Sequence, residues 1–265
     1  MNITVFTSNQ PRHLALLQRL GGVAHTVHAV LECGTLFPGL GPGFFRRSPV
    51  MQRYFHEVMR AEAEVFGGPG WAPSNVRVLP ALGGDLAHLS LQTLGPALDA
   101  DCFIVFGASY IKGELADLLI ARRALNIHMG ISPAYRGSSC NFWALYDQRP
   151  ELVGGTVHLL SKGLDSGDIL FHCLPPAQNA DPFTLGMLAV RSAVEGLAEH
   201  LSQGSLQGLA PVPQDKSAEL RYTRGEDFTD AVAQDYLEHL PSPQAIGSAL
   251  GSRDAARFIR PFVAA

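Results

Sequence analysis

The stretch 126–137, "NIHMGISPAYRG", places an asparagine and a histidine two positions apart at the mouth of a loop rich in glycine and proline. Side chains two apart on a strand point to the same side, so the amide of Asn126 and the imidazole of His128 can face one ligand atom. Asp165 lies in a later turn, "KGLDSGD", where flanking glycines let the backbone bend close to a site. Asn126, His128 and Asp165 are therefore our predicted catalytic residues.

These three side chains suit acyl transfer. An amide donates hydrogen bonds, a histidine titrates near neutral pH, and a carboxylate orients the histidine or raises its pKa. In acyl transfer a carbonyl becomes a tetrahedral oxyanion and a proton must move. Neither "GISP" nor "RGSSC" matches the Gly-x-Ser-x-Gly turn that presents a nucleophilic serine, so direct attack by an amine fits better than a covalent acyl-enzyme. Taken singly, His128 and Asp165 would more often be structural; their combination favours a site.

Composition narrows the class of protein. The chain has 265 residues, of which 46% are hydrophobic and 17% charged, which suits one large globular domain with at most a small addition. A net charge of −4 gives no overall attraction to nucleic acid or to an anionic membrane. The four cysteines are widely spaced and form no metal-binding pattern, so we expect no metal and a reducing cytoplasm. We find no signal peptide and no apolar stretch of about 20 residues, and expect no membrane association.

Short apolar runs alternate with amphipathic stretches, which predicts a mostly parallel α/β sheet in a Rossmann-like three-layer sandwich. We expect buried strands at 3–6, 25–32, 76–79, 102–107, 124–128, 154–161 and 169–174. Helices are predicted over 11–22 and 112–123, from Pro49 with Ser48 as its cap, and from Asp181–Pro182 to Gly204. In such sheets ligands bind at the carboxyl ends of strands, which is where Asn126 and His128 stand.

The chain divides into a predicted catalytic domain, 1–205, and a linker with a small C-terminal extension, 206–265. Residues 207–217 have the composition of a surface linker, and the tail after them shows weak helical patterns. The segment 34–49 is rich in glycine and proline, and we interpret it as a surface loop or as a lid that carries Arg46 and Arg47 over a substrate.

The motifs resemble those of the folate-dependent formyltransferases, whose hallmark is Asn-x-His before a Ser-Leu-Leu-Pro-like loop, with a later Leu-Asp-x-Gly turn. Here the same order and separation occur in "NIHMGISPAYRG" and "GGTVHLLSKGLDSGDIL", and the likeness covers roughly residues 1–205. The loop after His128 departs from the usual pattern, which leaves the acceptor open. The "YRG" at 135–137 is similar to the methionyl-tRNA and sugar enzymes more than to the glycinamide ribonucleotide enzyme.

The resemblance implies a role for each residue of the motif. Asn126 would hold the formyl oxygen, His128 would stabilise the oxyanion and move a proton, and Asp165 would keep His128 poised and order a water. The formyl donor would be 10-formyltetrahydrofolate, and no metal would take part. His158 would support the three catalytic residues without direct contact with the reacting atoms. By the same matching, the residues that line the folate pocket would be Ser109, Tyr110, Ile111, Leu160, Ser161, Lys162, Gly163 and Leu164.

An acceptor with a phosphate or carboxylate could bind where the first strand meets the first helix, because free backbone N–H groups gather there. We predict Ser8, Asn9, Arg12 and Arg136 as substrate-binding residues, with His13 beside them. Helix capping by Ser8 or Asn9 and a solvated Arg136 are the structural alternatives.

The favoured reaction is formyl transfer to a small-molecule amine, such as a nucleotide-linked amino sugar or an ornithine-like amino acid. Methionyl-tRNA is the second candidate; the acidic balance and a tail that looks short for a basic C-terminal domain stand against it. Hydrolysis of the formyl-folate is the third, and a chain that starts directly at the catalytic strand stands against that. A non-catalytic folate-binding protein is the fourth, disfavoured because a binder needs no oxyanion donor paired with a titrating histidine. A homodimer remains open.

Overall fold

The computed structural model describes residues 1–36 and 48–264. Most of the 34–49 loop, with Arg46 and Arg47, lies outside the described residues. The interpretation of this segment as a surface loop or a lid therefore stays a prediction. In the described ranges no helix is both long enough and apolar enough to cross a membrane.

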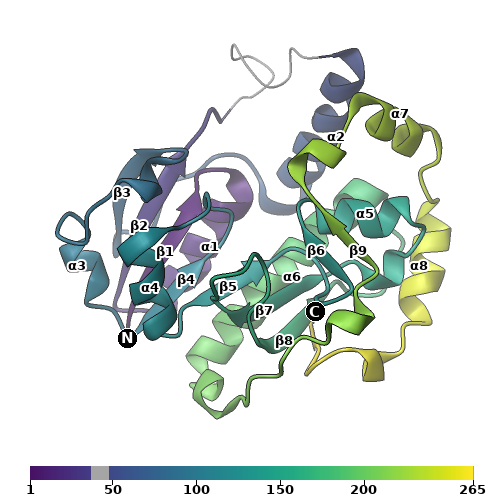
Figure 1. Ribbon diagram of the computed structural model, residues 1–265. Coiled ribbons are helices and arrows are strands. Elements are labelled where there is room, and N and C mark those ends of the chain that lie inside the picture. Colours follow the sequence, from purple (N-terminus) through teal and green to yellow (C-terminus); the bar gives the residue numbers. More distant parts are fainter. Residues whose placement is uncertain (37–47, 265) are drawn as a thin grey trace.

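An eight-stranded sheet forms the centre of the molecule, in the order β10-β8-β7-β5-β4-β1-β2-β3 (Figure 1). All its pairings are parallel except those of β7, which runs antiparallel to both neighbours. This confirms the predicted Rossmann-like, mostly parallel α/β fold. In chain order the strands are β1 (Asn2–Ser8), β2 (Thr26–Cys33), β3 (Val76–Leu82), β4 (Cys102–Val105), β5 (Leu125–His128), β7 (Gly155–Leu159), β8 (Ile169–Leu174) and β10 (Phe262–Val263).

Helices cover the sheet on both faces, because successive strand residues alternate between two apolar clusters. Ile3 and Val5 of β1 pack in the cluster that contains α1 and α6, whereas Phe6 packs in the cluster that contains α4. The helices are α1 (Pro11–Gly21), α2 (Pro49–Phe66), α3 (Gly95–Leu98), α4 (Gly113–Ala121), α5 (Cys140–Tyr146), α6 (Pro182–Ser202), α7 (Asp230–Glu238) and α8 (Pro243–Gly251). The long helices begin where the sequence predicts, with Ser48 capping α2 and Asp181 capping α6.

The prediction of a buried strand at 76–79 is wrong. Strand β3 extends to Leu82 and is largely exposed, with Val78 at 44% and Leu82 at 68% of their full accessible surface. The reason is its position at the end of the sheet, where it pairs only with β2. An apolar run alone does not distinguish such an edge strand from a central one.

Several short elements near the site were not predicted from the sequence. Helix α5 follows the 126–137 loop directly, and strand β6 (Tyr135–Gly137) lies within that loop. Strand β6 pairs in parallel with β9 (Arg221–Thr223) to form a second, two-stranded sheet. These pieces are too short to give a periodic pattern of their own.

The C-terminal segment 206–265 packs onto the rest of the chain. Its strand β10 pairs with β8 at the edge of the main sheet, and β9 pairs with β6 beside the 126–137 loop. Its helices α7 and α8 gather next to α2 and α5 in Figure 1, and they contribute buried Tyr236, Ile246 and Leu250 to a shared apolar cluster. The division into a domain 1–205 and an extension stays a prediction.

The N-terminal cap of α6 is expected to carry a measurable share of the stability. Asp181 Oδ1 accepts hydrogen bonds from the backbone N–H of Phe183 at 3.0 Å and of Thr184 at 3.1 Å, and Arg60 pairs with the same carboxylate. We expect Asp181→Ala to lower the free energy of unfolding by about 1–2 kcal/mol in urea titrations. Asp254→Ala is the control, because Asp254 caps only the single turn Ala255–Arg257, and a loss as large as that of Asp181→Ala would contradict the assignment.

Candidate active site

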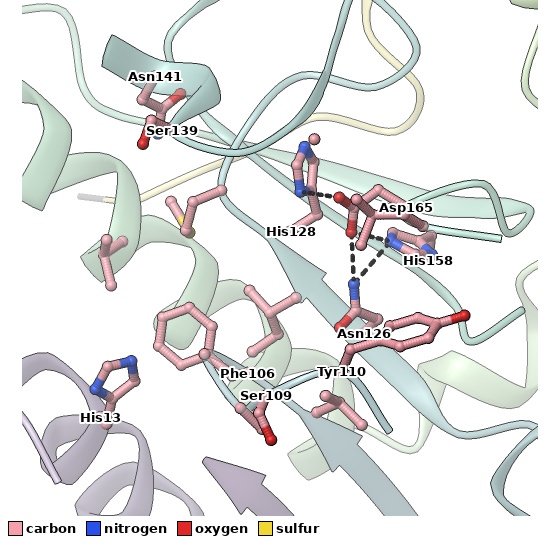
Figure 2. A pocket seen from close by; sticks show the side chains of 18 of the residues that line it. His13, Phe106, Ser109, Tyr110, Asn126, His128, Ser139, Asn141, His158 and Asp165 are labelled. Atoms are coloured by element: carbon pink, nitrogen blue, oxygen red, sulfur yellow. Dashed lines mark hydrogen bonds and ion pairs between the residues drawn. The ribbon is translucent and has the colours of Figure 1, made fainter. Parts of the chain in front are cut away.

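The predicted residues meet at strand β5 and its antiparallel neighbour β7. Asn126 stands directly opposite His158 in the register, and its Nδ2 lies 2.9 Å from His158 Nε2. The loop between β7 and β8 brings Asp165 back to the same place, with Oδ1 3.3 Å from Asn126 Nδ2 (Figure 2). The structure therefore brings Asn126, His128 and Asp165 together, with His158 as a fourth member.

His128 is held at both ring nitrogens. Its Nδ1 lies 3.3 Å from Asp165 Oδ2, and its Nε2 lies 3.2 Å from the backbone oxygen of Tyr135 in β6. Both partners are hydrogen-bond acceptors, and a neutral imidazole can donate from only one nitrogen. The surroundings of His128 are therefore built for the protonated, doubly donating form.

The pKa directions agree with this geometry. Burial lowers the pKa of His128. Its contacts with Cys140 and with the Asp165 carboxylate raise the pKa by more than burial lowers it, so the pKa of His128 stands well above the usual value. Burial raises the pKa of Asp165, because it too disfavours the charged form. The contacts of Asp165 with His128 and His158 outweigh burial and bring the pKa of this carboxyl well below the usual value. Both directions favour an imidazolium beside a carboxylate, in side chains that are 6% and 11% exposed respectively.

The tautomer of His158 follows from its neighbours. Its Nδ1 lies 2.8 Å from the backbone oxygen of Leu159, so Nδ1 carries a hydrogen and, in the neutral ring, Nε2 accepts from Asn126. Both N–H groups of the Asn126 amide then point at protein acceptors, one at His158 and the other at Asp165. A formyl oxygen held by Asn126 would have to share one of these hydrogens, so that role stays a prediction.

Gly130 provides the space that this arrangement needs. A Cβ at this position would lie 2.7 Å from His128 Nε2 and 2.4 Å from Cys140 Cβ, distances that no side chain could keep. Asp165 itself has a φ of 46°, in the left-handed region that aspartate tolerates better than most residues. The missing side chain at Gly130 leaves room for the His128 ring, and the left-handed backbone at Asp165 is part of the turn that carries its carboxylate to His128.

A cavity of about 960 Å³ opens beside these residues, large enough for a drug-sized ligand. Asn126, His128, His158 and Asp165 all line it. The two segments predicted for folate also line it without exception, namely Ser109, Tyr110, Ile111, Leu160, Ser161, Lys162, Gly163 and Leu164. The hydroxyl of Tyr110 donates to the backbone oxygen of Lys162 at 2.9 Å, which ties the two segments together.

The predicted anion-binding residues are placed differently. Ser8 and Asn9 do not line the cavity, and the Asn9 amide exchanges two hydrogen bonds with the backbone of Gly34. Arg12 does line it, but Glu62 Oε1 accepts both from its guanidinium at 2.6 Å and from its backbone N–H at 3.2 Å. A buried carboxylate of this chain thus occupies the start of α1, where an acceptor anion was predicted.

Arg136, the fourth predicted substrate residue, lies outside the cavity lining. It pairs with Glu219 at 2.9 Å and donates to the backbone oxygen of Leu164 at 3.0 Å. Its guanidinium therefore contacts the loop that carries Asp165, and a direct contact between Arg136 and substrate stays a prediction.

His13 adds a polar group that the sequence suggested only in another role. It is 3% exposed, packs against Phe106 with ring centroids 4.9 Å apart, and lines the cavity. Burial, and then the nearby Arg12, lower its pKa well below the usual value, so the ring is neutral. Its Nδ1 has no protein partner within the described ranges, and Figure 2 shows the ring across the cavity from His128. A neutral imidazole suits a hydroxyl or carbonyl better than a phosphate.

The arrangement can donate a proton or a strong hydrogen bond to an oxyanion that forms in the cavity. Within residues 1–36 and 48–264, no group of three or more His, Cys, Asp or Glu side chains is positioned to hold a metal ion.

Comparisons with known proteins agree with this chemistry. Residues 90–189 match the model of the formyl transferase family. A methionyl-tRNA formyltransferase of Synechococcus sp. (strain JA-3-3Ab) is 31% identical over 156 residues, covering 58% of this chain and 45% of that protein. Another, of Anaeromyxobacter dehalogenans (strain 2CP-1 / ATCC BAA-258), is 31% identical over 157 residues, covering 59% and 47%. The chain thus spans about half the length of the curated relatives it matches.

Solved structures share the fold. A 4-N formyltransferase from Francisella tularensis superposes with a TM-score of 0.53 at 17% identity, covering 89% of this chain and 86% of that one. An N-formyltransferase from Helicobacter canadensis, in complex with folinic acid and dTDP-3-aminofucose, gives 0.51 at 11% identity and covers 89% and 79%. At such low identity these likenesses establish the fold alone.

The His128–Asp165 pair makes a direct prediction about pH. In the native chain His128 stays protonated at pH values above the ordinary histidine pKa, and it loses this proton only as the pH rises through its raised pKa. Asp165→Asn removes the carboxylate at nearly equal volume and leaves burial and the Cys140 contact in place, so the midpoint moves to lower pH. An NMR titration of the His128 ring measures this shift. Asp168→Asn, an exposed site in the same loop, is the control; an unchanged midpoint in Asp165→Asn would disprove the coupling.

Proposed function

We propose, from the folate-dependent formyltransferase family that these matches support, that the chain transfers a formyl group from 10-formyltetrahydrofolate to the amine of a small-molecule acceptor. The observation that carries the proposal is the convergence of Asn126, His128 and Asp165 on one wall of a cavity of about 960 Å³. Direct attack of the amine on the formyl carbon then gives a tetrahedral oxyanion, without a covalent intermediate on the chain.

His128 acts in this scheme as the acid. Its imidazolium, poised by Asp165, shares with the oxyanion the Nε2–H that otherwise faces the Tyr135 carbonyl, and supplies this proton as the leaving nitrogen of the folate departs. The proton of the attacking amine restores the imidazolium, so the charges balance over one turnover. Asp165 stays ionised throughout, which its lowered pKa favours.

Asn126 and His158 complete the site from β5 and β7. The Asn126 amide bridges Asp165 and His158, and so fixes the carboxylate against rotation. When the formyl oxygen is present, one N–H of this amide turns from a protein acceptor to the oxyanion. Such sharing strengthens as charge develops, which is when stabilisation lowers the barrier.

The cavity also suits the formyl donor. The segments at 109–111 and 160–164 line it with backbone groups and apolar side chains, a combination that binds planar heterocycles with a polar edge. Tyr110 is 55% exposed at this wall and offers a ring face to a ligand. The N-formyltransferase from Helicobacter canadensis was crystallised with folinic acid, which supports a folate ligand for this chain as well.

The acceptor is proposed to be small and to carry no phosphate at the start of α1. Glu62 already satisfies the backbone N–H and the guanidinium of Arg12 there. His13, which is neutral and lines the cavity, is suited to a hydroxyl or carbonyl of the acceptor. An amino sugar whose ring hydroxyl meets His13 satisfies both conditions, and an amino-acid-like amine remains within the proposed class.

Formylation of methionyl-tRNA is the second candidate, because the curated relatives bear that name. The matched segments cover only 45% and 47% of those proteins, so the activity of the whole relatives does not transfer directly to this chain.

An acceptor screen decides between the candidates. We expect tetrahydrofolate release from 10-formyltetrahydrofolate, together with a mass gain of one formyl group, on a nucleotide-linked amino sugar or hydroxylated ornithine. Activity on initiator methionyl-tRNA alone, weakened strongly by salt, would replace the proposal by the second candidate. Release of tetrahydrofolate without any amine would indicate a hydrolase, and folate binding without turnover would indicate a binding protein.

The acid role of His128 has its own test. His128→Asn and Asp165→Asn should each lower kcat/KM by roughly two to four orders of magnitude, because each removes the proton donor or its support. The control Asp168→Asn should keep near-native activity, since it changes an exposed charge in the same loop. Steady-state kinetics with the acceptor from the screen measure these values. Activity within about threefold of native in either site variant would exclude this mechanism.

A further inference from the structure

One side chain from the predicted linker 207–217 contacts the loop that carries Asp165. Gln214 Nε2 donates two hydrogen bonds, to the backbone oxygens of Asp165 and Gly167, both at 2.8 Å. Two carbonyl oxygens can only be satisfied by a donor, which fixes the orientation of the amide. The Gln214 Oε1 atom is buried and has no partner in the described part of the chain, so the two donated bonds are what hold this side chain.

We propose that Gln214 is a positioning residue of the active site, and that it acts through Asp165 on the protonation of His128. The loop needs such support because Asp165 adopts a φ of 46°, a conformation that costs free energy in a free chain. The loop backbone also lies close against β7, where a Cβ on Gly167 would come within 1.7 Å of the Leu159 oxygen. The loop is therefore held by contacts with both β7 and Gln214.

Gln214 can serve as a clamp because its own backbone is anchored. Val212, two residues earlier, forms a pair of backbone hydrogen bonds with Ile169 at the start of β8, both 2.8 Å long. This bridge sets the distance between the 212–214 stretch and the end of the Asp165 loop. A flexible linker in the same place would lack such a fixed distance.

The C-terminal segment also supports the same loop indirectly, through Arg136 of β6. Arg136 donates to the oxygen of Leu164, next to Asp165, and Glu219 holds the Arg136 guanidinium at 2.9 Å. Arg136 itself belongs to β6, which pairs with β9 in the C-terminal segment. Its neighbour Tyr135 supplies the carbonyl that faces His128 Nε2. The stretch 212–223 thus supports the carboxylate and the imidazole from two sides.

The consequence concerns the extent of the catalytic unit. The family match ends at residue 189, and the sequence suggested a catalytic domain that ends at 205. If Gln214 sets the Asp165 loop, the working site includes part of the C-terminal segment. The effect on rate rests on the proposed function, whereas the effect on the titration of His128 does not.

The test is an NMR titration of His128 in the full chain, with its signal assigned from a His128→Asn spectrum. In Gln214→Met, which keeps the length but removes both donors, the His128 midpoint should move to lower pH, because the Asp165 carboxylate is less firmly held. Gln207→Met, the same change at an exposed glutamine, should leave the midpoint unchanged. Equal midpoints in Gln214→Met and native protein would overturn the proposal.

Kinetics separate positioning from general destabilisation. Gln214→Met should lower kcat/KM about tenfold in the native background and have no further effect in an Asp165→Asn background. A purely structural role would give the same loss in both backgrounds and would contradict the proposal. Failure of every acceptor to react would remove the proposed function and leave the titration intact.

Should Gln214→Met not fold, as judged by circular dichroism, Gln214→Asn provides the same comparison. It keeps a polar amide but shortens the side chain by one methylene, which weakens the two hydrogen bonds to the Asp165 and Gly167 oxygens. A smaller downward shift of the His128 midpoint is expected. No shift in this folded variant would overturn the proposal in the same way.

Discussion

The buried ion pair between His128 and Asp165 is the interaction on which the rest of the site depends. Two groups that are 6% and 11% exposed must keep opposite charges, which is costly unless each remaining polar atom has a partner. The chain meets this demand with the carbonyl of Tyr135 on one side and the amide of Asn126 on the other. A charge held ready in this way needs little reorganisation when an oxyanion forms.

The sheet topology explains how four polar side chains reach one point. Insertion of the antiparallel β7 between β5 and β8 sets His158 opposite Asn126 and lets the following loop fold back over β5. An all-parallel order would require a crossover helix in place of that loop. The single antiparallel strand is therefore what allows Asp165 to meet residues 126 and 128 across a short connection.

Much of this was predictable from residue types and spacing. The apolar runs of β1, β2, β4 and β8 and the caps at Ser48 and Asp181 obey local rules, so their elements appeared where expected. Edge position is not a local property, and the apolar run of β3 was therefore assigned wrongly to the interior. Short elements such as α5, β6 and β9 exist because tertiary contacts hold them, and they leave no periodic pattern by which they could be predicted.

The sequence by itself determined the available chemistry: an asparagine and a histidine at the end of one strand and an aspartate in a later loop, within motifs that resemble those of the formyltransferases. Only the tertiary structure decided how these groups are charged, because burial and the contacts of His128 with Tyr135, Cys140 and Asp165 depend on how the chain folds back on itself. It also decided that Glu62 fills the start of α1 and that Gln214 reaches the Asp165 loop. Long-range contacts of single side chains leave no periodic trace in a sequence, which is why neither was foreseen.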